Sequence, residues 1–324
     1  MNKLLSIKNL QVEFKTDSAT IKAVRGVSLD IKAGETVAIV GESGAGKSQV
    51  FHALMGLLPN NGKAQGGADF IGQSMLNQPA KVLNNIRGKQ VSMIFQDPMT
   101  ALNPYLRIGK QLTEVLEIHQ IMPFKQARVK AIQMLEKVHI KQPDVRFNSY
   151  PHELSGGMRQ RVVIAMALLC EPKLIIADEP TTALDVTVQT EIIRLLREIH
   201  QSLKTSIVLI THDLPLVAGL CERIIVMYAG RIVESGTVEQ IFHHAKHPYT
   251  KALLAATPAN SQTNGRLQAI DGQPPDPLNL PTGCAFHPRC AFAEDDCFKQ
   301  VPELIKLGSG QQFACVFAER DTSS

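Results

Sequence analysis

The sequence predicts an α/β protein whose mixed sheet carries a glycine-rich loop at the end of a buried strand. Short apolar runs alternate with helical repeats along much of the chain. The strand-like runs lie at 36–40, 91–95, 173–177, 206–210 and 223–227, and the helical patterns between them at 157–169, 186–203 and 214–221. Residues 5–31 instead alternate apolar and polar positions, which predicts antiparallel strands near the N-terminus.

A helical insertion interrupts this pattern. From 103 to 152 the apolar period is that of amphipathic helices, punctuated by prolines, which predicts a small helical subdomain at about 103–170. Residues 59–90 are rich in glycine and asparagine and read as irregular, with one short strand near 68–71.

The composition excludes several classes of function. The 324 residues are 44% hydrophobic and 20% charged, with a net charge of +4 and no tryptophan. The charge is too small to indicate a nucleic-acid partner, and no apolar run approaches the ~18 residues that cross a membrane. The first residues soon become polar, so no signal peptide is expected. We expect a cytosolic protein that reaches a membrane only through a partner.

The most informative motif is Gly41-Glu42-Ser43-Gly44-Ala45-Gly46-Lys47-Ser48, between a predicted strand and a predicted helix. The glycines let the backbone curl so that several N–H groups face one hollow, and the helix adds the positive end of its dipole. Lys47 suits the β- and γ-phosphates of a nucleotide, and the Ser48 hydroxyl suits Mg²⁺. The predicted nucleotide-binding residues here are Gly41, Ser43, Gly44, Ala45, Gly46, Lys47, Ser48 and Gln49.

An acidic pair completes the predicted pocket. Asp178 and Glu179 follow the apolar run 174–177, at the carboxyl end of a predicted parallel strand, where such sheets bind ligands. Asp178 suits the Mg²⁺ shell, and Glu179 can polarise the water that attacks the γ-phosphate.

A second glycine-bearing helix start lies at Leu154-Ser155-Gly156-Gly157-Met158. By itself this motif favours an ordinary capped helix N-terminus. One nucleotide has one γ-phosphate, however, and the loop at Gly41 already covers it. We therefore infer that Ser155, Gly156 and Gly157 bind the phosphate of a nucleotide held by another subunit.

Taken in order, these motifs resemble the ATP-binding subunit of an ABC transporter over roughly residues 4–242. The six elements are GESGAGKS, Gln96, LSGGM, LIIADE, Ala183-Leu184-Asp185 and Thr211-His212-Asp213. The resemblance implies an ABC-type P-loop ATPase domain at 1–242, with a mixed core sheet, an N-terminal antiparallel β-subdomain and the inserted helical subdomain. A small cysteine-rich extension would occupy 243–324.

The resemblance also implies roles for single residues. Gln96 would contact Mg²⁺ and couple the pocket to membrane subunits, Asp185 would lie at the dimer seam, and His212 would meet the γ-phosphate. Glu179, His212 and Gln96 are thus the predicted catalytic residues, and Ser48, Gln96 and Asp178 the predicted Mg²⁺ ligands. Phe14 is expected either to stack on adenine or to be an ordinary buried strand residue.

A finer resemblance is to the dipeptide/oligopeptide importer group. It rests on the run 95–104, on Ala229-Gly230-Arg231, on His247-Pro248-Tyr249-Thr250 and on the cysteine-bearing tail. Within that group the chain most resembles the first (D-type) of two ATPase subunits. This implies a second homologous ATPase, two membrane permease subunits, a peptide-binding protein outside the membrane, and a position on the cytoplasmic face of the cell membrane.

Three rival functions remain open at this stage. A nickel or other small-solute importer has similar ATPase subunits. A soluble ABC ATPase would usually have two cassettes or a long coiled coil, which this chain lacks. A small-molecule P-loop kinase would leave LSGGM without a role.

Six cysteines fall into two sets. Cys170 and Cys221 lie in apolar stretches and are expected to be buried small hydrophobes. Cys284, Cys290, Cys297 and Cys315 cluster in the last fifth of the chain without the tight pairs of structural zinc. We expect a structural [4Fe–4S] cluster, supported by the resemblance of the tail to the oligopeptide group, with Zn²⁺ or free thiols as the alternatives.

Overall fold

A computed structural model describes residues 3–182, 184–257, 270–316 and 318. The chain forms two compact units. One comprises Met1–Lys32, Thr36–Gln78 and Ile210–Ser324, and the other comprises Ala33–Glu35 and Pro79–Leu209. The described residues on both sides of residue 242 fall within the same unit as the N-terminal strands. The domain boundary predicted at residue 242 therefore stays a prediction.

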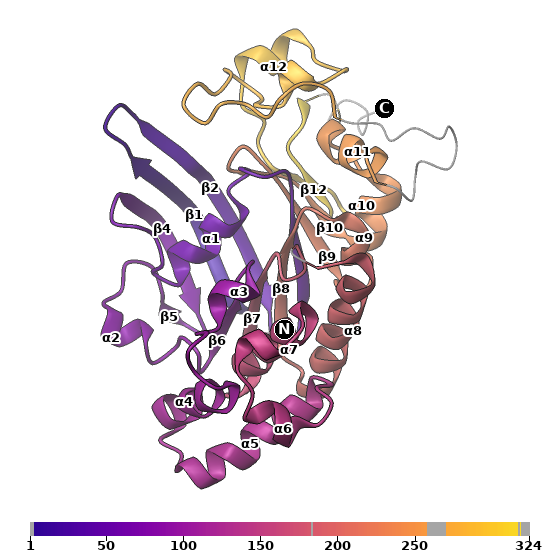
Figure 1. The fold of residues 1–324 in the computed structure, drawn as a ribbon. Helices are drawn as coiled ribbons and strands as arrows, with labels where there is room; N and C mark the ends of the chain where they lie inside the picture. Colours follow the sequence, from indigo (N-terminus) through magenta and orange to yellow (C-terminus); the bar gives the residue numbers. More distant parts are fainter. Residues whose placement is uncertain (1–2, 183, 258–269, 317, 319–324) are drawn as a thin grey trace. The chain divides into compact units, whose positions relative to one another are not determined.

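The first unit begins with the predicted antiparallel sheet (Figure 1), whose strand order is β2-β1-β4-β5. Its bounds are β1 (Lys3–Lys15), β2 (Thr20–Lys32), β4 (Gly62–Phe70) and β5 (Gln73–Ser74). The apolar positions of the alternating pattern, Leu5, Ile7, Leu10 and Val12, are buried. They lie on the face of the sheet that packs into the core.

A second sheet portion in this unit carries the phosphate loop. Its strands run in the order β11-β12-β10-β9-β3. They are β3 (Thr36–Val40), β9 (Arg223–Tyr228), β10 (Arg231–Thr237), β11 (Ile305–Lys306) and β12 (Gln312–Phe313). Every residue of β3 is buried, and β3 is parallel to β9. The loop that leaves the carboxyl end of β3 leads directly into α1 (Lys47–Leu54).

Short helices complete the first unit. They are α9 (Leu214–Ala218), α10 (Val238–His244), α11 (Pro248–Ala255) and α12 (Asp295–Lys299). Strand β12 pairs with β10, so the far end of the cysteine-bearing segment joins the sheet of this unit. No helix in the described ranges combines the length and the apolar character that a membrane span requires.

The second unit contains the strands β8 (Ser206–Thr211), β7 (Leu174–Asp178) and β6 (Val91–Ile94), in that order, with β6 parallel to β7. The boundary between the units falls within β8, after Leu209. The helices of the unit are α2 (Ala80–Leu83), α3 (Pro98–Ala101), α4 (Ile108–Gln120), α5 (Phe124–Lys137), α6 (Pro143–Phe147), α7 (Gly156–Leu168) and α8 (Val186–Leu203). Helices α4, α5 and α6 pack on one another (Figure 1, magenta).

The structure corrects the interpretation of residues 59–90. Strand β4 covers nine residues, Gly62–Phe70, instead of a short piece near 68–71. Its glycines hide the alternating pattern, but β4 pairs with β1 on both sides of a register shift at Gly66, and this pairing keeps the strand together. Helices α3 and α6 and strand β10 were not predicted, because elements of four to seven residues show little periodicity.

Candidate nucleotide site

The phosphate loop has glycine where its path tolerates no side chain. Gly46 is the N-cap of α1 with φ +89°, and a Cβ there would lie 2.3 Å from the Ala23 carbonyl oxygen. A Cβ on Gly41 would lie 2.2 Å from the Met227 carbonyl oxygen. The tight curl that exposes the loop amides therefore depends on these two glycines.

Lys47 is held by the entrance of the loop. Its side chain amine Nζ donates to the carbonyl oxygens of Gly41 at 2.8 Å and Glu42 at 3.0 Å, and the residue is only 5% exposed. Ser43 and Gly44 are exposed, and the first turn of α1 carries no acidic residue. An exposed loop, a buried ammonium and an uncancelled helix dipole are suited to bind an anion such as the nucleotide phosphates.

The second unit brings Gln96 and Glu179 together. Gln96 Nε2 donates to Glu179 Oε2 at 2.9 Å, and the Thr182 hydroxyl donates to the same oxygen at 2.9 Å. Glu179 follows β7 with φ 45°, an uncommon conformation for a residue with a side chain. Its neighbour Asp178 is buried at the end of the strand, 5% exposed. The two acidic residues thus lie at the sheet edge that the sequence predicts.

The LSGGM motif opens α7 as predicted. The Ser155 side chain accepts the Met158 N–H at 3.4 Å and caps the helix, while Ser155 and Gly156 are exposed. Asp185 is likewise exposed and caps α8 by accepting the Val188 N–H at 3.0 Å. Both helices therefore begin at an exposed capping residue.

The remaining predicted site residues lie in the first unit. His212 is exposed and directly follows β8. The N–H of the next residue, Asp213, donates to the Thr211 hydroxyl at 3.0 Å. Phe14 is half-buried on β1, with its ring beside Gly62. The assignment of both residues to the nucleotide stays a prediction. Ala183 lies outside the described residues.

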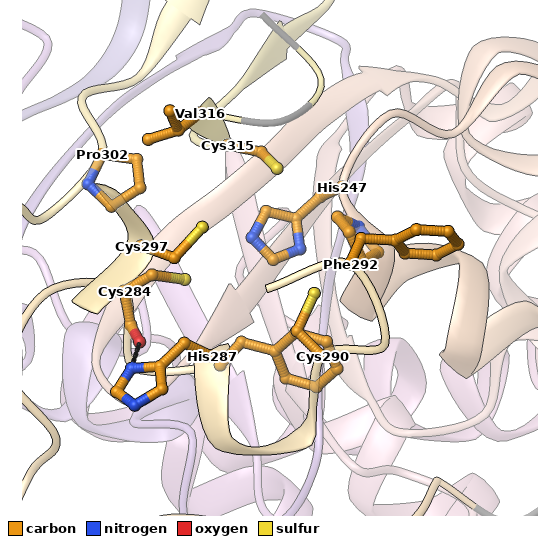
Figure 2. Close-up of a pocket in the computed structure, with 11 residues that line it drawn as sticks. His247, Cys284, His287, Cys290, Phe292, Cys297, Pro302, Cys315 and Val316 are labelled. Atoms are coloured by element: carbon orange, nitrogen blue, oxygen red, sulfur yellow. Dashed lines mark hydrogen bonds between the residues drawn. The ribbon is translucent and has the colours of Figure 1, made fainter. Parts of the chain in front are cut away.

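Cys170 and Cys221 are buried, as expected, and burial raises the pKa of both thiols. The four C-terminal cysteines line one small cavity of about 10 Å³ (Figure 2). They are Cys284, Cys290, Cys297 and Cys315. Within the described ranges, no group of three or more histidine, cysteine or acidic side chains is arranged to hold a metal ion.

His247 lines the same cavity. At the level of sequence it had no predicted role at the cysteines and belonged only to the run that resembles the dipeptide/oligopeptide importer group. Figure 2 shows its ring among the cysteine sulfurs. The residue is 1% exposed, and burial lowers its pKa to about 3, so the imidazole is neutral. Its Nδ1 accepts the Tyr249 N–H at 3.0 Å, which places the proton on Nε2, and Nε2 has no partner among the described residues.

Arg289 was also missed, because nothing local marks it. Its guanidinium forms a bidentate ion pair with Glu42 of the phosphate loop, at 2.7 and 3.0 Å. This pair raises the pKa of Arg289 further above its already high value. A contact between residues so far apart in sequence becomes visible only in the folded chain.

The fold and the site define the class of protein. A phosphate loop after a buried strand, an acidic pair after a parallel strand and a serine-capped glycine helix start are the features of ATPases of the ATP-binding cassette class. A solved member of that class, the cassette MJ0796 in a dimeric post-hydrolysis state bound to ADP and Pi, matches with a TM-score of 0.65. It is 29% identical, over 72% of this chain and 98% of its own.

Comparison with known sequences narrows the class to a family. A family profile described as "ABC transporter" matches residues 24–182, and one described as "Oligopeptide/dipeptide transporter, C-terminal region" matches residues 233–297. The oligopeptide transport ATP-binding protein OppD of Haemophilus influenzae is 52% identical over 97% of both chains. The dipeptide transport ATP-binding protein DppD of Bacillus subtilis is 51% identical over 93% of this chain and 91% of its own. The chain belongs to the ATP-binding proteins of ABC transporters, in their oligopeptide/dipeptide group.

Proposed function

We propose that this protein is the ATP-hydrolysing subunit that powers peptide import across the cytoplasmic membrane. The observation that carries the proposal is likeness over nearly the whole chain to oligopeptide and dipeptide transport ATP-binding proteins, the C-terminal region included. A nickel or other small-solute importer is less well supported, because the relatives described above are named for peptide transport.

The residues divide the work of hydrolysis between binding and chemistry. The loop amides and Lys47 hold the phosphates, and the ammonium exchanges its carbonyl partners for phosphate oxygens. Ser48, Gln96 and Asp178 would hold Mg²⁺, because a hydroxyl, an amide oxygen and a carboxylate are oxygen ligands of the kind that it prefers, and the ion would supply charge neutralisation. Glu179, oriented by Gln96 and Thr182, aligns the attacking water and accepts its proton.

A partner subunit completes this proposal. The exposed start of α7 is free of acidic residues in its first turn, so Ser155 and Gly157 can contact a γ-phosphate that a second homologous ATPase holds. The dimeric state of the solved relative supports this arrangement. Asp185 would lie at the seam and His212 at the γ-phosphate. Two permease subunits would hold the pair at the inner face of the membrane, where an extracytoplasmic binding protein delivers the peptide.

The experiment is ATP hydrolysis by the reconstituted transporter with its binding protein. We expect peptide-loaded binding protein to stimulate hydrolysis, and Ni²⁺ without peptide to leave the rate unchanged. Stimulation by Ni²⁺ and not by peptide would overturn the substrate assignment while leaving the ATPase assignment intact.

We also propose that the four C-terminal cysteines hold a [4Fe–4S] cluster. Four thiols line one cavity whose other lining is mostly aromatic and aliphatic. The Nε2–H of His247 is a buried donor without a partner in the described structure, and thiolates or sulfides would accept its hydrogen bond. Zn²⁺ on the same four thiols is the alternative.

The cluster proposal is tested on the full chain purified without oxygen. The protein should be brown, absorb near ~400 nm and contain about four irons per chain. Cys290→Ser should lose the colour, whereas Cys221→Ala, a buried cysteine outside the cavity, should keep it. Colourless protein with one zinc per chain would contradict the proposal.

A further inference from the structure

The cysteine-bearing C-terminal segment contacts the phosphate loop through Arg289. This residue ends the short 3-10 helix His287–Arg289, between Cys284 and Cys290. Its Nη1 donates to Glu42 Oε2 at 2.7 Å and its Nη2 donates to Glu42 Oε1 at 3.0 Å. We propose that Arg289 is a positioning residue for nucleotide binding: it neutralises the Glu42 carboxylate and fixes the peptide that orients Lys47.

The guanidinium is itself held in place. Arg289 Nε donates to the Asp271 carbonyl oxygen at 2.9 Å, and Nη1 also donates to the Tyr228 hydroxyl at 3.3 Å. The rings of Tyr228 and Phe286 each lie 5.9 Å from the guanidinium carbon. The Arg289 side chain is 4% exposed and the Glu42 side chain 24%, so water screens this pair far less than a surface pair. Geometry of this kind favours a strong, specific contact.

The charge of Glu42 explains why the loop needs this contact. Glu42 directly follows Gly41 in a loop built to bind phosphate, and a carboxylate there opposes an anionic ligand. The Arg289 guanidinium neutralises that charge by pairing with both carboxylate oxygens. Without Arg289, the phosphate loop would keep a partly buried carboxylate with no compensating cation from this residue.

The main chain of Glu42 carries the effect to Lys47. The Glu42 N–H donates to the Tyr249 hydroxyl at 2.8 Å, and its carbonyl oxygen accepts from Lys47 Nζ at 3.0 Å and from the Ala45 N–H at 3.2 Å. The side chain and both peptide groups of this one residue are therefore anchored. Freeing the side chain would loosen the carbonyl that helps to place the Lys47 ammonium.

The inference rests on nucleotide binding at the phosphate loop, and it does not depend on whether the cysteines hold a cluster. The experiment measures the Kd for MgATP on the full chain and the KM for ATP in the assembled transporter. The variants are Arg289→Ala, Arg289→Lys, and Arg289→Ala combined with Glu42→Gln. Lys3→Ala, which removes an exposed ion pair with Asp30 in the same unit, is the matched control.

We expect Arg289→Ala to raise the Kd about tenfold, and Arg289→Lys, which keeps the charge but not the fork, to raise it about threefold. The KM should rise with the Kd, while kcat at saturating ATP falls less. Adding Glu42→Gln to Arg289→Ala should bring the Kd back to within about threefold of the wild type, because the uncompensated charge is gone. Lys3→Ala should leave the Kd unchanged.

Two results would overturn the inference. One is a folded Arg289→Ala variant, or a folded Arg289→Lys variant if the alanine variant does not fold, that binds MgATP like the wild type. The other is a double variant that binds no better than Arg289→Ala, since a contact that only supports the fold would not be rescued by removing a charge. A wild-type chain that binds no MgATP would instead refute nucleotide binding itself.

Discussion

Glu179 is the residue on which we expect turnover to depend most. It leaves β7 in a left-handed conformation, and two donors, Gln96 and Thr182, converge on its Oε2. A side chain that stays in an unfavourable backbone conformation is held there by its surroundings, and such positions cluster at functional sites. The carboxylate is thereby oriented before any ligand binds.

Replacing Glu179 by glutamine tests its role. Glutamine keeps the size and one oxygen acceptor but removes the charge that orients water and takes its proton. We expect Glu179→Gln to bind ATP while the turnover of the assembled complex falls by at least ~10²-fold. Single-turnover hydrolysis and nucleotide binding, measured on the same preparation, check this. Near-normal hydrolysis would show that another group is the base.

At the scale of elements, the helix starts contribute to local stability, and some of them also have a predicted role in nucleotide binding. Helices α7, α8 and α10 are each capped by a side-chain oxygen, from Ser155, Asp185 and Thr237 respectively. Thr237 forms a full capping box with Gln240, and this helix has no predicted role in nucleotide binding. Its cap is therefore suited to measure local stability alone.

Thr237→Ala should lower the free energy of unfolding by about 1 kcal/mol, because it leaves the Gln240 N–H without its acceptor. Chemical denaturation of the isolated chain measures the loss. Thr190→Ala is the matched control, because Thr190 is exposed and, among the described residues, its hydroxyl donates only to the Val186 carbonyl oxygen within α8. We expect a change below ~0.5 kcal/mol. Equal losses of unfolding free energy at both positions would show that the cap stabilises the chain no more than an ordinary exposed hydroxyl does.

The start of α7 tests whether the site is shared. A Cβ on Gly157 would lie 2.9 Å from Val188 Cγ1, so Gly157→Asp would disturb its own chain as well as a partner's phosphate. Gly156 has room, since its nearest neighbour would be Leu184 Cδ2 at 3.6 Å. We expect Gly156→Asp to weaken ATP binding in the partner's pocket and to spare its own. Nucleotide binding to each pocket of mixed complexes measures this, and loss confined to its own pocket would refute the assignment in trans.

At the scale of the whole molecule, one chain carries both a phosphate loop and the exposed helix start that would serve another loop. We therefore expect the isolated chain to hydrolyse ATP poorly, and the second ATPase with the membrane subunits to raise the rate. Lys47→Ala should weaken ATP binding in this chain's own pocket. The substitution removes the ammonium group, which bonds to the Gly41 and Glu42 carbonyl oxygens and which we propose to bind the phosphates when ATP is present. Full activity of the isolated monomer would contradict a shared site.

The amino-acid sequence by itself determined the features that depend on neighbouring residues. Strand β3, the phosphate loop and α1 follow from an apolar run, three glycines and a helical period within a few residues of one another. The same holds for Asp178 and Glu179 after β7 and for the capped start of α7. Local sterics and hydrogen bonding specify such elements, so they can be recognised without knowledge of the fold.

Only the tertiary structure decided the features that join distant segments. Strand β4 is extended because β1 pairs with it, although its own glycines predict irregular chain. The ion pair of Arg289 with Glu42, and the meeting of His247 with the four cysteines, unite residues that no periodicity or spacing relates. A partner far along the chain contributes its energy only after folding has brought it near, so this information lies in the packing of the whole chain and not in any single motif.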